Sequence, residues 1–111
     1  MDSFIKNIED LEWINSNHIG VPKKLFFTGN IFQSNITQTA YTELNKDIEI
    51  PIHVHETMEE VFFLFDGICE FKIGNENFVV TKDSIIRIPA NTQHSIKAIT
   101  NCKFFYFGVS I

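Results

Sequence analysis

Turn residues interrupt this chain every few positions and limit its apolar runs to the length of a β-strand. Asp66 and Gly67 separate the runs 61–65 and 68–73, and the polar segment 74–77 ends the second run. Gly, Asn and Asp accept the backbone angles of tight turns, so these sites reverse the chain. Short runs with frequent reversals are typical of an all-β sandwich or barrel.

We therefore expect one all-β domain over residues 1–111, built as a single antiparallel β-barrel. Short loops favour antiparallel neighbours. The first 20 residues lack this pattern, and we expect an irregular segment or short edge strand there, with one turn near Asp10 and Leu11. The expected strands are 24–28, 35–44, 48–54, 61–65, 68–73, 78–81, 84–88, 94–100 and 102–109.

Composition and charge disfavour several function classes. The net charge is -5 at pH 7 and the nine Lys and Arg residues are scattered, so nucleic-acid binding is not expected. No stretch approaches the roughly 18 apolar residues of a membrane span. Residues 1–14 lack the continuous apolar run of a signal peptide. These features favour a cytoplasmic protein in which Cys69 and Cys102 are buried free thiols.

Three of the four histidines form, with a glutamate, a pattern that suits a metal ion. His53 and His55 share one face of an extended strand, because alternate residues point the same way. Glu60 follows five residues later, and His94, from a distant strand, could close the site. Imidazole suits Zn, Cu, Fe and Ni, and a carboxylate extends the range to Mn. We expect these residues to bind one divalent ion of Zn, Cu, Fe, Ni or Mn.

The segment 53–67 resembles the first sequence motif of the cupin superfamily. That motif has two histidines separated by one residue, then a glutamate, then a glycine after six further residues, which Glu60 and Gly67 match. The segment 83–94 resembles the second motif, in which a histidine stands five positions after a proline, as His94 does after Pro89. The 15 residues between the motifs are similar in number to those of small single-domain bacterial cupins.

Four positions depart from the two motifs. Asp47 and Asp83 stand where the glycines that usually open the motifs would be, and Asn91 replaces the glycine of the proline turn. Asn tolerates the left-handed backbone conformation nearly as well as Gly. Ala98 stands where an asparagine often closes the second motif. None of these positions supplies a metal ligand, so the departures leave the expected site intact.

The resemblance implies a jelly-roll barrel in which His53, His55, Glu60 and His94 hold one metal ion and leave up to two open positions. We call these four residues the His/Glu cluster. Glu59 is the rival carboxylate, but the six-residue spacing to the motif glycine favours Glu60. The remaining histidine, His18, lies in a polar segment and is expected to be solvent-exposed.

The apolar run 61–65 indicates both a pocket and a partner subunit. Strand alternation places Phe62 on the inward face with Glu60, and Tyr106 on the last strand is a second candidate for binding a small-molecule ligand. The run is apolar on both faces, so we expect its outer face to be buried in a homodimer.

The cupin resemblance covers the fold and the metal site but does not name a reaction, and we expect a small metal-dependent enzyme of the dioxygenase, isomerase or decarboxylase type. Its substrate would be a small organic or sugar acid. The alternative is a non-catalytic module that binds a small ligand.

Overall fold

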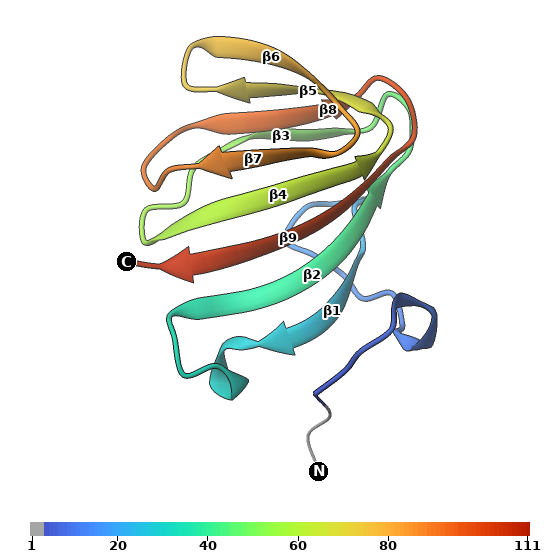
Figure 1. Ribbon diagram of the computed structural model, residues 1–111. Coiled ribbons are helices and arrows are strands. Elements are labelled where there is room, and N and C mark those ends of the chain that lie inside the picture. Colours follow the sequence, from blue (N-terminus) through green and yellow to red (C-terminus); the bar gives the residue numbers. More distant parts are fainter. Residues whose placement is uncertain (1–3) are drawn as a thin grey trace.

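The computed structural model describes residues 4–111, which fold into antiparallel strands and two short 3-10 turns (Figure 1). The all-β prediction is confirmed, and each expected strand overlaps an observed one. The strands are β1 (Lys23–Thr28), β2 (Ile36–Leu44), β3 (Glu49–His53), β4 (Met58–Asp66), β5 (Ile68–Ile73), β6 (Glu76–Thr81), β7 (Ser84–Ile88), β8 (His94–Ala98) and β9 (Cys102–Ser110). The turns are η1 (Ile8–Asp10) and η2 (Gly29–Ile31).

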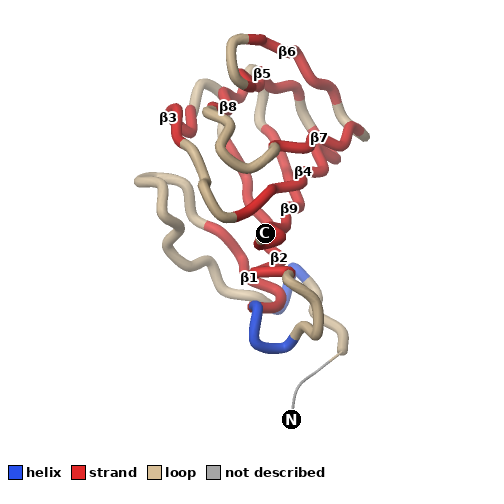
Figure 2. The backbone as a smooth tube through the Cα atoms, turned by 90° about the vertical axis from the view of Figure 1, so that its left-hand side faces the viewer, coloured by secondary structure: helices blue, strands red, loops and turns tan. Residues whose placement is uncertain are grey.

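The strands form two antiparallel sheets, consistent with the expected jelly roll, but the sheets are not closed into a single barrel. One sheet has the order β1-β2-β9-β4-β7 and the other has the order β3-β8-β5-β6. Among the described residues, no strand of one sheet pairs with a strand of the other. In Figure 1 the four-stranded sheet lies at the top of the view and the five-stranded sheet below it, and Figure 2 shows the same two groups from the side.

Left-handed turn residues lie at four of the points where the chain crosses from one sheet to the other. Asp47 lies between β2 and β3, Gly67 between β4 and β5, Asp83 between β6 and β7, and Asn91 between β7 and β8. All four have a positive φ, between 59° and 98°. Each therefore turns the chain sharply away from its strand direction. The chain crosses between the sheets at these points, and the two sheets pack face to face around a shared core.

The core lies between the sheets and shows the alternation expected of strands. On β4, Glu60, Phe62 and Leu64 are buried, whereas Val61 and Phe63 on the opposite face are half-buried. The buried core continues on both sheets through Leu44, Cys69, Phe71, Ile88, Ile96, Cys102 and Phe104. Both cysteines are buried free thiols, as expected. The inward row of β4 therefore carries Glu60 into the space between the sheets.

The N-terminal segment is irregular, as expected for residues 1–20, although residues 1–3 lie outside the described residues. The turn η1 agrees with the single turn expected near Asp10. An isolated antiparallel bridge joins Ile14 to Lys23, the first residue of the edge strand β1. Trp13 then packs against Tyr41 on the five-stranded sheet, with ring centroids 5.8 Å apart. Over residues 4–111, neither helical turn has the length or the apolar character needed to cross a membrane.

Candidate metal centre

The strand registers bring the His/Glu cluster together from three strands and a loop. His53 ends β3 and His94 begins β8, and the two residues are partners in the antiparallel ladder. His55 follows β3, and Glu60 lies on the inward face of β4. One possible ligand atom from each residue lies within 4.8 Å of the others. The structure thus places all four expected ligands at one point.

Two atoms of the cluster are buried without a hydrogen-bond partner. Glu60 Oε1 lies 3.2 Å from His55 Nε2 and 3.3 Å from His94 Nε2, but it makes no hydrogen bond, and His94 Nε2 makes none either. An unsatisfied buried polar group costs about 1 to 3 kcal/mol. A cation between these atoms would remove that cost for both, so the residues present fit a metal ion.

Backbone carbonyls fix the ring orientation of two histidines. His53 Nδ1 donates to Pro51 O at 2.8 Å, and His94 Nδ1 donates to Thr92 O at 2.9 Å. A carbonyl oxygen can only accept, so the proton of each neutral ring resides on Nδ1. The lone pair of Nε2 is then free to bind a metal, which is the usual arrangement in histidine metal sites.

Burial and neighbouring groups shift the pKa values of these two rings in opposite directions. Burial lowers the pKa of His53, the hydrogen bond to Pro51 O offsets part of this shift, and the nearby His94 and His55 add to the lowering. Burial also acts to lower the pKa of His94, but the Glu60 carboxylate and the Thr92 carbonyl outweigh it, so the net shift is upward. Metal binding needs neutral imidazoles, so a cation at the cluster would compete with the proton on His94.

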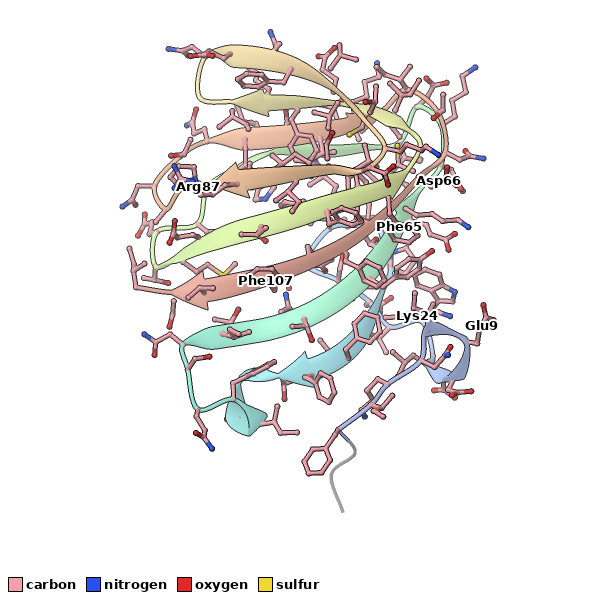
Figure 3. All side chains as sticks on the ribbon, viewed as in Figure 1. Glu9, Lys24, Phe65, Asp66, Arg87 and Phe107 are labelled. Carbon is pink, nitrogen blue, oxygen red and sulfur yellow. The ribbon has the colours of Figure 1, made fainter. Side chains whose placement is uncertain are left out.

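The rival carboxylate, Glu59, lies outside the cluster. Its Oε1 is 3.3 Å from Nη1 of Arg87, whose side chain is 66% exposed, and the Glu59 side chain is 41% exposed. Figure 3 shows Arg87 at the margin of the sheet, away from the space between the layers. The glutamate that the motif spacing favours, Glu60, is therefore the one that lies with the three histidines.

His18 is not solvent-exposed, and that prediction is wrong. The residue is half-buried, and its ring centroid lies 4.6 Å from that of His53. The Ser16 hydroxyl explains the placement, because it accepts from His18 N at 3.1 Å and donates to Val21 O. This turn folds the loop back over the cluster, and Val21 is buried. The only signal in the sequence was Ser16, a residue type that often holds tight turns.

A pocket opens beside the cluster and encloses about 70 Å³. Phe62 and Tyr106, the two expected ligand-binding residues, line it and stack with ring centroids 5.4 Å apart. Burial raises the pKa of Tyr106, and the nearby Glu60 adds to the shift, so its phenol stays protonated at neutral pH. Lys23 and Gln38 also line the pocket, and no motif had pointed to either.

Comparisons with known proteins agree with this geometry. The family model described as "Cupin domain" matches residues 40–108. An uncharacterized protein of Methanocaldococcus jannaschii is 38% identical over 50 residues, which cover 45% of this chain and 40% of that protein. This chain thus matches less than half the length of that relative.

Solved structures with the same fold include the following two. A predicted oxalate decarboxylase from Thermotoga maritima has a TM-score of 0.86 at 16% identity, over 96% of this chain and 99% of its own. An RmlC-like cupin from Shewanella frigidimarina has a TM-score of 0.81 at 14% identity, over 99% of this chain and 93% of its own. At these identities the likeness concerns the fold alone. The family match covers more than half of the chain and contains every residue of the cluster, and this protein belongs to the cupin domain family.

Proposed function

We propose that this protein is a small metal-dependent enzyme that acts on a small organic acid or sugar acid. The main support for this proposal is that ligand atoms of three imidazoles and one carboxylate lie within 4.8 Å of one another. The unpaired buried atoms Glu60 Oε1 and His94 Nε2 support the presence of a cation. Three nitrogen ligands and one oxygen ligand suit Fe, Mn, Ni, Zn or Cu.

The surroundings of the cluster suit a catalytic ion better than a structural one. Four protein ligands leave up to two positions of an octahedral shell for a substrate. A divalent cation bound there would polarise a carbonyl or carboxyl oxygen. Phe62 and Tyr106 supply the apolar wall that orients a ligand and excludes water, and the protonated Tyr106 hydroxyl can donate a hydrogen bond to it.

Metal-dependent turnover tests this proposal. The protein is loaded separately with Fe(II), Mn(II), Ni(II) and Zn(II) and incubated with small diketones, sugar acids and aromatic diols, and substrate consumption is followed by NMR. We expect consumption of at least one substrate with at least one metal, and its loss in His94→Ala. Saturable binding without consumption across the panel would contradict the enzyme and indicate a ligand-binding module.

A further inference from the structure

We propose that the ligand of this pocket is a small acid that carries a carboxylate at the end remote from the metal, and that the Lys23 ammonium binds this carboxylate. The inference rests on the proposed metal site, because the other end of the ligand would occupy the open positions of the ion. It narrows the substrate class to small acids with two oxygen-containing groups, one that binds the metal ion and a carboxylate that binds the ammonium.

Lys23 is directed into the pocket by its place on β1. It pairs in register with Thr42 of β2, which is buried. Its side chain is half-buried and lines the same pocket as the His/Glu cluster. The Nζ atom donates to Oε1 of Gln38 at 2.8 Å. A neutral amide oxygen therefore holds the ammonium in the pocket and uses one of its three donors.

No carboxylate balances this charge over residues 4–111. The ion pairs within that range, found at N···O distances up to 4.0 Å, involve Glu59 and Glu60 and do not include Lys23. Burial lowers the pKa of Lys23, which reflects the cost of holding a cation there without a partner. A partly desolvated ammonium with free donors is complementary to an anion.

The register also gives the spacing between the backbones that carry the two ends of the site. Gln38 and Glu60 are both partners of Gly108, on opposite sides of β9. Their backbones are therefore two strand spacings apart, about 10 Å. Gly108, the residue between them, has no side chain, and the side chains of Thr37 and Met58 lie next to it. A short chain with an acidic group at each end suits a pocket of this size that has the cluster and Lys23 in its lining, whereas a neutral ligand would leave the ammonium unpaired.

Calorimetric titrations of Zn(II)-loaded protein test the inference. Malonate, succinate and glutarate are compared with their monomethyl esters, which lack one charge, and bound zinc is measured after each titration. We expect the wild-type protein to bind at least one diacid about ten-fold or more tightly than its ester. Lys23→Met should abolish this preference at unchanged zinc content, and Lys23→Arg should preserve it.

Lys24 provides the matched control because it is the adjacent lysine and lies outside the pocket. Its Nζ donates to Ile8 O at 2.8 Å and lies 5.0 Å from the ring centroid of Trp13. Figure 3 shows Lys24 beside the N-terminal turn. Lys24→Met should keep the wild-type preference for the diacid, which separates the role of Lys23 from a general effect of removing a positive charge.

Three outcomes would overturn the inference: equal affinities for diacids and esters, an undiminished preference in Lys23→Met, or no binding by any acid of the panel. Failure of the metal proposal is recognised separately, because the wild-type protein would then retain no zinc. In that case the same titrations are made on metal-free protein. A preference for the diacid that is lost in Lys23→Met would still support carboxylate binding by Lys23.

Discussion

Short local hydrogen bonds prepare the histidine rings of the cluster for a ligand. The carbonyls that bind His53 and His94 belong to Pro51 and Thr92, each two residues earlier in the chain. The orientation of each ring is thus fixed within its own segment. Glu60 is placed differently, by the inward alternation of β4 in the core. Two of the imidazoles are thus oriented by hydrogen bonds within their own segments, and the carboxylate is placed by packing.

Replacing Glu60 by Gln should weaken metal binding by more than about ten-fold, because the amide keeps the shape but loses the ligand charge. Competition with a chromophoric chelator measures the affinity. Glu59→Gln is the matched control, since Glu59 lies on the outside against Arg87, and it should bind metal as the wild-type protein does. Equal losses in the two variants would mean that Glu60 is not a ligand.

The His18→Ala variant should retain its metal. His18 packs on His53, but it is not one of the four residues whose ligand atoms converge. Elemental analysis should therefore find wild-type occupancy in this variant and reduced occupancy in His53→Ala. A loss of metal from His18→Ala equal to that from His53→Ala would show that the loop supplies a fifth ligand.

At the scale of strands and turns, the glycine that ends the first motif is required for two separate reasons. Gly67 has a φ of +98°, and a Cβ there would lie 2.3 Å from Asn101 O and 2.9 Å from Cys102 Cα. Gly74 has a φ of +60°, but a Cβ there would meet nothing within 4 Å. Comparing the two positions separates the cost of the backbone angle from the cost of close approach.

Gly67→Ala should lower the free energy of unfolding by about 2 to 4 kcal/mol, through strain and a clash with backbone atoms. Gly74→Ala should cost only the strain of a left-handed alanine, about 1 to 2 kcal/mol. Urea denaturation followed by circular dichroism measures both values. If Gly67→Ala were no less stable than Gly74→Ala, a destabilising clash of the added Cβ with Asn101 and Cys102 would be disproved.

The sequence predicted the strands well because their signals are local. Alternation on 68–73 and the turns beside it placed β5 at its observed bounds. Motif spacing likewise singled out Glu60, and Asp47, Asp83 and Asn91, which replace motif glycines, all have a positive φ.

The errors concern contacts between distant segments. Whether two edge strands meet to close a barrel depends on sheet twist, which no local pattern encodes. The packing of the loop that carries His18 on His53 is equally non-local. The lysine of the pocket escaped notice for the same reason, because its partner Gln38 is 15 residues away.

At the scale of the whole molecule, the outer face of the five-stranded sheet, which faces away from the four-stranded sheet, is strongly apolar. A groove on this face is lined by Val61, Phe63, Ile85, Phe105 and Phe107. Figure 3 shows Phe65 and Phe107 on the side of the sheet that faces the viewer. An exposed apolar surface of this kind is typical of a protein–protein contact. We propose that a second copy of the chain covers it in a homodimer.

Light scattering should give a mass about twice that of the 12.9 kDa chain at micromolar concentration. Ile85→Lys should shift the mass toward that of a monomer, because it places a charge on a residue 70% exposed in the single chain. Val79→Lys, at a residue 68% exposed on the other sheet, should leave the mass unchanged. A wild-type mass of 12.9 kDa would contradict the dimer.

The central claim is that the His/Glu cluster binds one divalent ion, and elemental analysis of protein purified without an affinity tag tests it most directly. We expect near one Fe, Mn, Ni, Zn or Cu ion per chain, and near none in the folded double variant His53→Ala, His55→Ala. The wild-type protein should also lose thermal stability on chelation, because an ion bound only by the folded state stabilises it. Wild-type occupancy in the double variant would place the metal elsewhere and contradict the account.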